Sequence, residues 1–188
     1  MKYIILIFIC FFNFSFAANI VQNDDAKTAF VYLNKIRQNP DSYSKEIGVD
    51  LSDVSPMPQL RWNDTLALVA EERAQDMADR NYCAHVDPEG YGVNYKINKA
   101  GYKLNKLFLE DKSANFFESI GCGHENGIEL IKELIIDRNT PDLGHRYHLL
   151  GIGEWDKNLY EIGIGFVKAK NDEYISYASI IIAKHDFW

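Results

Sequence analysis

Residues 60–85, LRWNDTLALVAEERAQDMADRNYCAH, carry the clearest helical pattern in the chain. Asn63 has the side chain of an N-cap, and apolar residues follow it at helical spacing: Leu66, Val69, Ala70, Ala74 and Met77. This pattern predicts a helix that ends near Arg80. Charged residues lie between the apolar ones and are interpreted as a solvated, charge-balanced face, not as catalytic carboxylates: Glu71, Glu72, Arg73, Asp76 and Arg80.

Outward from this helix, helical and extended patterns alternate. Further helices are predicted from Asp24 or Asp25 to Asn39-Pro40, over 93–100 and around 128–135, and a further short element is predicted over 144–150. Strands are predicted over 116–122, 160–168 and 173–184. The last two strands are expected to form a hairpin at Asn171-Asp172, and the final strand to be central and covered on both faces. The charged segment 102–114 is expected to be a surface loop.

The first 17 residues have the composition of a secretory signal peptide. Lys2 precedes an apolar run over residues 4–12, and the small residues Ser15 and Ala17 occupy the positions of a cleavage site. The run is shorter than the roughly 20 apolar residues that a transmembrane helix needs. We therefore expect a secreted protein, or a periplasmic one in a Gram-negative bacterium. One domain is expected over residues 24–188.

The charge of the chain argues against one class of partner. It has 20 Lys and Arg against 27 Asp and Glu, a formal net charge of −7. An acidic surface repels phosphate backbones, and the sequence has no clustered run of Lys and Arg. Nucleic acids are therefore not expected as partners.

Two cysteines lie beyond the predicted signal peptide, Cys83 and Cys122. In an oxidising compartment the simplest prediction is one disulfide between them. The alternative is a catalytic thiol beside an imidazole, either Cys83 with His85 or Cys122 with His124, although sequence neighbours rarely form such pairs.

Three residues far apart in the chain could share one divalent ion: His85, Glu118 and His145. A zinc site with three protein ligands keeps a fourth position open for water or substrate. Glu118 is the strongest single candidate, because a carboxylate between Phe117 and Ile120 is almost never buried without a partner. We expect a divalent cation here, with zinc as the first choice.

Four motifs occur in order along the chain. The first is Leu60-Arg61-Trp62-Asn63 before a helix that is followed by Cys83-Ala84-His85. The other three are Phe117-Glu118-Ser119-Ile120, Gly144-His145-Arg146 and Ile162-Gly163-Ile164-Gly165. Together they resemble the CAP superfamily of cysteine-rich secretory, antigen 5 and pathogenesis-related proteins, in particular bacterial members with an SCP-like extracellular domain. The resemblance implies an α/β fold, a three-layer α-β-α sandwich with a mixed central sheet. It also implies a wide cavity with two histidines and acidic residues, here His85, Glu118 and His145, which bind zinc in some members.

The chain departs from the family pattern in two places. Many members supply a second glutamate from the helix before the last histidine, whereas residues 133–138 read ELIIDR and offer only Glu133 or Asp137. Bacterial relatives tend to have asparagine where this chain has His148, which on a helix shares a face with His145. Asp137 and His148 are therefore the candidates for a fourth ligand, and water is the alternative.

Three functions stay open. The favoured one is a non-enzymatic secreted domain whose cavity binds a divalent cation and an extracellular peptide or lipid-like ligand. The second is a metal-dependent extracellular hydrolase, peptidase-like, with Glu118 as the base, although the chain lacks a Gly-x-Ser-x-Gly nucleophile motif. The third is a surface interaction module that binds a protein partner and has a vestigial cavity.

Overall fold

Two long strands form the centre of the molecule, β4 (Glu161–Lys168) and β5 (Ser176–Ala183). The structure is a computed structural model that describes residues 20–21, 23–138, 140–170 and 173–185; the predicted signal peptide and the Asn171-Asp172 turn lie outside these ranges. β4 and β5 pair antiparallel, as predicted for a hairpin. β3 (Glu118–Cys122) pairs antiparallel with the other edge of β5. Every residue of β5 is buried, which confirms the prediction of a central strand.

Two short strands make the sheet mixed. β1 (Ile20–Val21) pairs antiparallel with β4, and β2 (Arg61–Trp62) pairs parallel with it. The strand order is β1-β4-β5-β3, with β2 also beside β4. β3 is therefore an edge strand of the described sheet, and Glu118 is its first residue.

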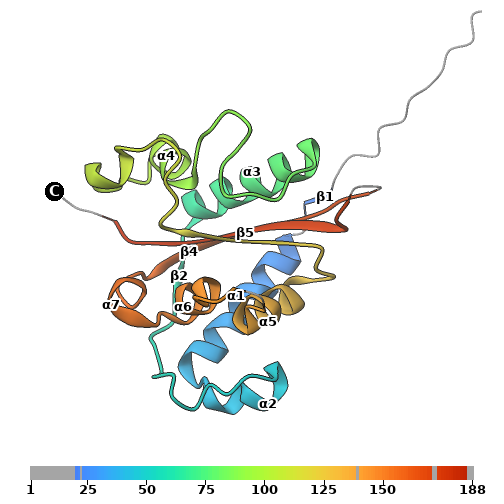
Figure 1. Cartoon of the computed structure of the whole chain (residues 1–188), viewed down its shortest axis with the longest axis vertical. Coiled ribbons are helices and arrows are strands. Elements are labelled where there is room, and N and C mark those ends of the chain that lie inside the picture. The colour runs from blue at the N-terminus through green and yellow to red at the C-terminus, as the bar shows by residue number, and fades with distance from the viewer. Residues whose placement is uncertain (1–19, 22, 139, 171–172, 186–188) are drawn as a thin grey trace, which may run out of the picture.

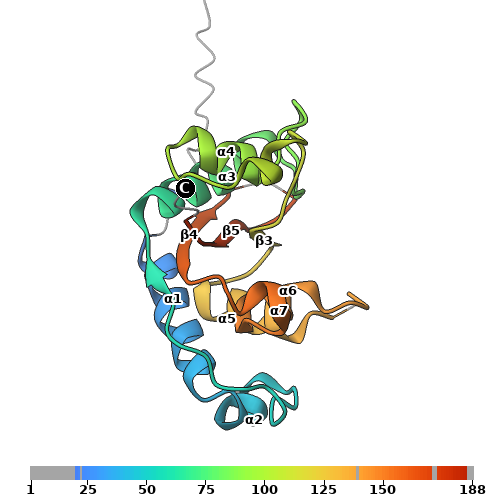
Figure 2. The same cartoon turned by 90° about the vertical axis from the view of Figure 1, so that its left-hand side faces the viewer.

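Helices cover both faces of this sheet, as Figure 1 shows. On one face lie α3 (Asp64–Arg80) and α4 (Val93–Lys99); on the other lie α1 (Asn23–Gln38), α5 (Gly127–Ile136) and α6 (Gly144–Leu150), an arrangement also visible in Figure 2. Shorter helical turns occur at η1 (Asp41–Tyr43), α2 (Ser44–Ile47), η2 (Lys106–Leu109) and α7 (Gly153–Asp156). The predicted α/β fold, a three-layer α-β-α sandwich with a mixed sheet, is confirmed. None of the helices in the described ranges has the length and apolar character of a membrane-spanning segment.

Helix α3 forms where its cap and its apolar stripe predict it. The side-chain oxygen of Asn63 accepts hydrogen bonds from two backbone N–H groups of the first turn, at 3.0 and 3.1 Å. The helix packs closely on β4 because two strand residues have no side chain. A Cβ at Gly163 would lie 2.1 Å from the backbone nitrogen of Ala67, and one at Gly165 would lie 2.3 Å from the carbonyl carbon of Ala70. The buried face of α3 therefore lies directly against the sheet.

One expectation about exposure is wrong. Arg73, assigned to the solvated face of α3, is only 1% exposed. It lies three residues after Ala70 and four before Met77, so it falls on the buried stripe of the helix. The segment 102–114 is largely exposed, as expected of a surface loop, although the side chains of Tyr102 and Leu104 are buried and the segment contains η2.

Candidate functional site

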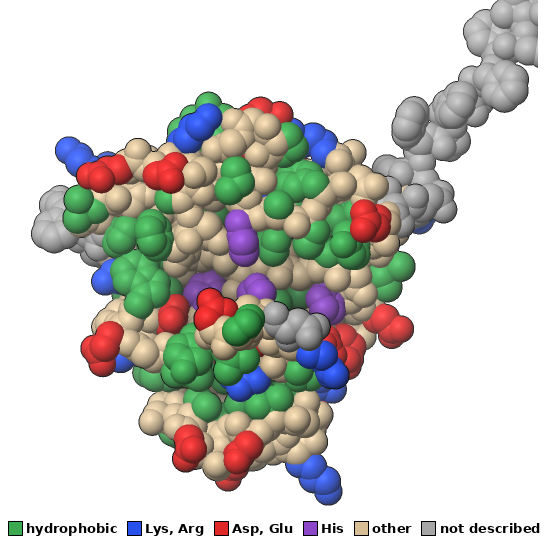
Figure 3. Space-filling model, in the orientation of Figure 1, with side chains coloured by type: hydrophobic (Ala, Val, Ile, Leu, Met, Phe, Trp, Pro, Cys, Tyr) green, Lys and Arg blue, Asp and Glu red, His purple; other side chains and the backbone are tan. Residues whose placement is uncertain are grey.

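The predicted site residues meet in one cleft, which lies between β3, the loop after α3, and helices α6 and α7. The cleft has a volume of about 460 Å³ and is lined by His85, Glu118, His145 and His148, among others. Figure 3 shows histidine side chains gathered in a hollow across the middle of this face. The fold therefore brings the three predicted ligands to one surface, together with one of the two candidates for a fourth.

Glu118 is the most deeply buried of the three predicted ligands, with no solvent exposure of its side chain. Its Oε1 atom accepts hydrogen bonds from Arg73 Nε at 3.1 Å and from Ser179 Oγ at 2.8 Å, and its Oε2 atom lies 3.2 Å from His85 Nδ1. Burial alone would raise the pKa of Glu118, but the hydrogen bond with His85 and the charge of Arg73 outweigh burial and hold this pKa below its ordinary value. Glu118 is therefore an ionised carboxylate whose two oxygens already have partners.

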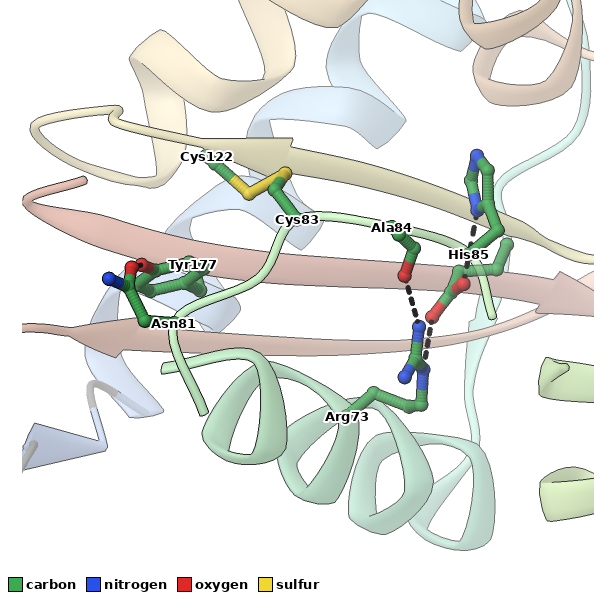
Figure 4. The surroundings of a disulfide bond; sticks show 8 residues. Arg73, Asn81, Cys83, Ala84, His85, Cys122 and Tyr177 are labelled. Carbon is green, nitrogen blue, oxygen red and sulfur yellow. Dashed lines mark hydrogen bonds and ion pairs between the residues drawn. A yellow bond between two sulfur atoms is a disulfide. The ribbon is translucent and has the colours of Figure 1, made fainter. Parts of the chain in front are cut away.

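Arg73 holds the loop that carries His85. Besides its contact with Glu118, its Nη2 atom donates to the carbonyl of Ala84 at 2.8 Å and its Nη1 atom donates to the hydroxyl of Tyr82 at 2.8 Å. Figure 4 shows the guanidinium between the helix and this loop. Because Ala84 precedes His85, one side chain fixes both the backbone beside the histidine and the carboxylate that faces its ring. This role was not predicted from the sequence, where the position of Arg73 on the apolar stripe is its signal.

His145 has a carboxylate partner of its own. Its Nδ1 atom lies 2.7 Å from Asp137 Oδ1, and its backbone N–H donates to Asp137 Oδ2 at 2.9 Å. Asp137 ends α5 in the left-handed conformation, with φ 52°, which a residue with a side chain adopts at an energetic cost. Burial would raise the pKa of Asp137, but the hydrogen bond with His145 and further bonds hold it below its ordinary value. Asp137, a candidate fourth ligand, is therefore engaged with His145.

His148, the other candidate for a fourth ligand, is buried at the back of the cleft. Its Nδ1 atom lies 2.7 Å from Ser119 Oγ, and its buried Nε2 atom has no hydrogen-bond partner in the described part of the chain. Burial lowers the pKa of His148 to about 4, against a smaller opposing effect of the Ile182 backbone. His148 is therefore a neutral imidazole near pH 7.

Cys83 and Cys122 form the predicted disulfide, with their Cα atoms 6.5 Å apart. Figure 4 shows that it links the loop after α3 to the end of β3, two residues before His85. Both sulfurs are engaged in the bridge, so the alternative of a catalytic thiol is not supported. The disulfide at Cys83 and the hydrogen bond from Arg73 to Ala84 therefore hold adjacent residues of the loop after α3.

Metal binding stays a prediction. No three His, Cys, Asp or Glu side chains among the described residues are arranged as a metal-binding group. However, the Nδ1 atoms of His85 and His145 each face a carboxylate, which leaves both Nε2 atoms as the available ring nitrogens. Metal-ligating histidines usually have such a partner behind them. The residues present therefore fit an ion held by two imidazoles, with Glu118 and Asp137 behind them.

Comparisons with known proteins agree with this architecture. Residues 30–182 match the model of the cysteine-rich secretory protein family, CAP. A solved structure of an extracellular protein with an SCP domain from Bacillus anthracis str. Ames is 21% identical, with a TM-score of 0.54 over 87% of this chain and 41% of that chain. An outer surface protein from Borrelia burgdorferi is 19% identical, with a TM-score of 0.59 over 89% of this chain and 98% of that chain.

At these identities the two solved structures establish the fold alone. This chain spans about two fifths of the length of the Bacillus protein. A search of curated protein sequences gives no match.

Proposed function

Because the chain belongs to the cysteine-rich secretory protein family, CAP, we propose that it is a binding domain whose cleft takes up one divalent cation through His85 and His145. The observation that carries this proposal is the carboxylate behind each ring, Glu118 at 3.2 Å and Asp137 at 2.7 Å from the respective Nδ1 atom. Such a partner fixes the tautomer in which Nε2 is free to bind a metal and raises its basicity. Imidazole ligands favour zinc and similar transition metals over calcium and magnesium, which prefer oxygen.

In this proposal Glu118 orients His85 and does not contact the ion. Its charge is compensated by Arg73, and its side chain has no solvent exposure. The three-ligand site expected from sequence becomes a two-histidine site with coordination positions left for water or a ligand. A bound divalent ion would offer a Lewis-acidic position to an oxygen atom of such a ligand.

The contacts of Glu118 favour binding over hydrolysis. A general base must reach the proton that it removes and should have a pKa near the working pH. Both carboxylate oxygens of Glu118 are already bonded, and the pKa of this group lies below its ordinary value. Glu118 is therefore poorly suited to the base role that a metal-dependent peptidase would require.

We infer that the protein works outside the cytosol. The Cys83–Cys122 disulfide is typical of oxidising compartments. The two similar structures are those of an extracellular protein and of an outer surface protein. Amino-terminal sequencing of protein exported from its host checks the inference, because cleavage after Ala17 is expected.

Calorimetric titration of EDTA-stripped protein with zinc tests the cation site. Wild type should bind close to one equivalent, and His85→Ala and His145→Ala should each lower the affinity at least about tenfold. Asp137→Asn should lower it by a similar factor, because the ring of His145 loses its partner. His124→Gln is the matched control, since His124 does not line the cleft. The proposal fails if wild type gives no zinc-dependent heat, or if both histidine variants bind as tightly as wild type.

A further inference from the structure

One wall of the same cleft is aromatic. Phe116 and Trp155 both line it, are 50% and 37% exposed, and have ring centroids 6.2 Å apart. Phe108 packs against both rings, with centroid distances of 5.6 and 5.3 Å. The indole N–H of Trp155 donates to the carbonyl of Phe116 at 3.4 Å, so the single polar atom of this ring has a partner within the protein. The wall therefore presents apolar ring surface to the cleft.

A carboxylate adjoins this wall. Asp156 follows Trp155 in α7 and lines the same cleft. Among the described residues, its carboxylate has no ion pair and no hydrogen bond to another residue. The neighbouring Lys157 is paired with Glu154 at 2.6 Å. Arg37 attracts Asp156 without forming an ion pair with it, and donates its own hydrogen bonds to backbone carbonyls.

The electrostatics of Asp156 are those of an incompletely compensated charge. Burial raises the pKa of Asp156 to about 6, against the attraction of Arg37. A carboxylate in direct contact with a cation normally shows the opposite shift. A cation placed in the cleft beside Asp156 would therefore supply compensation that the described residues do not.

We propose that Phe116, Trp155 and Asp156 form a subsite for the guanidinium group of an arginine side chain carried by an extracellular peptide. A guanidinium is planar and weakly hydrated, and it stacks on aromatic rings while its edge pairs with a carboxylate. The apolar wall and the adjoining carboxylate match these two surfaces. The net charge of −7 favours the approach of a cationic peptide. The subsite goes beyond the cation site proposed above, because it uses neither of its histidines.

Other charges face the subsite and determine how it must be tested. The Nζ atom of Lys184 lies 6.0 Å from the centroid of a Trp155 ring, at the outer limit of a cation–π contact. Asp142 also lines the cleft and adds negative charge. A divalent ion between His85 and His145 would repel a guanidinium in the same cleft. The subsite is therefore tested on metal-free protein.

The experiment is an NMR titration of EDTA-stripped protein with N-acetyl-arginine methylamide, whose only charge is the guanidinium. The indole N–H signal of Trp155 should shift and saturate. The uncharged N-acetyl-norleucine methylamide should bind at least about fivefold more weakly. Asp156→Asn should reduce arginine binding to the norleucine level. Asp53→Asn, in a separate pocket between the 50–57 loop and α7, should leave it unchanged.

Equal affinities for the arginine and norleucine compounds, or unchanged arginine binding in Asp156→Asn, would overturn the subsite. Tighter binding of N-acetyl-lysine methylamide would overturn the assignment to guanidinium. Because the titration contains no metal, a failed zinc experiment leaves this proposal standing, and a failed arginine titration leaves the cation site standing.

Discussion

Arg73 and Glu118 form a buried ion pair, with Nε 3.1 Å from Oε1 and almost no solvent exposure of either side chain. Further contacts extend from both ends of the pair, from Arg73 to the carbonyl of Ala84 and from Glu118 to Ser179 and His85. Breaking a buried pair is costly, because the residue left behind keeps an uncompensated charge. The pair therefore couples the stability of the fold to the orientation of His85.

Arg73→Met should lower the free energy of unfolding by about 3–5 kcal/mol, because Glu118 then stays buried and unpaired. The double variant Arg73→Met/Glu118→Met removes both charges and should recover most of that loss. Its zinc affinity should nevertheless stay at least about tenfold below wild type, because His85 lacks its carboxylate. Urea unfolding and zinc titration measure the two effects separately.

Arg80→Met is the matched control for this series, because Arg80 lies on the same helix and pairs with Asp76 near the surface. Its urea midpoint should stay close to that of wild type. An Arg73→Met protein as stable as the Arg80→Met protein would contradict the importance of the buried pair.

His148→Asn should flatten the pH dependence of stability between pH 6.5 and pH 4. Burial lowers the pKa of His148 from 6.5 to about 4, so in this window the unfolded chain binds a proton that the folded chain resists. The contribution of His148 is fully present above pH 6.5 and is lost as pH falls toward 4, by about 3 kcal/mol at most. Asparagine does not titrate and can still bond Ser119. Urea unfolding of both proteins at several pH values gives the comparison; equal slopes would show that His148 is not the titrating group.

Asp156→Asn should stabilise the protein at neutral pH. Burial raises the pKa of Asp156 from 3.8 to about 6, so the stability that this group contributes is present below its unfolded value and is lost as pH rises through 6. Because the side chain is only partly buried, solvent screening reduces the effect to about 1 kcal/mol. The variant should therefore exceed wild type at pH 7.5 and match it at pH 4 in denaturant titrations. Asp142→Asn, at an exposed position of the same cleft, is the matched control.

Cys83→Ser/Cys122→Ser should lower the free energy of unfolding by roughly 4 kcal/mol, the effect expected when a bridge across a sequence separation of 39 is removed. The zinc affinity should also fall, because the loop before His85 loses one of its two attachments. Reducing agent should shift wild type toward the variant and leave the variant unchanged. Unchanged zinc affinity in the variant would show that the hydrogen bonds of Arg73 hold the loop by themselves.

Much of the fold could be predicted because its signals are local. The cap at Asn63 and the stripe that follows it specify α3, and the run Ile180-Ile181-Ile182 indicates a strand covered on both faces. The charges of segment 102–114 predict its exposure, but they do not show which side chain turns inward. Tyr102 does so, and its hydroxyl donates to Glu161 at 2.7 Å.

The site could be predicted only as a set of residues. The apolar neighbours of Glu118 indicated that this carboxylate needs a partner, but the partner is Arg73, 45 positions away on another element. The same limit applies to the pairing of Ser119 with His148, which are 29 positions apart. Such contacts depend on the register of the strands and on the distance between a helix and the sheet. The local periodicity of the sequence predicts neither.

Gly163 and Gly165 do not line the cleft, yet they restrict which changes it can tolerate. A methyl group at either position would displace α3 from β4, and the guanidinium of Arg73 would move with the helix. The orientation of the His85 ring therefore depends on Gly163 and Gly165, which do not line the cleft. Natural selection for ligand binding in this family member would therefore also act on β4, a strand that does not contact the ligand.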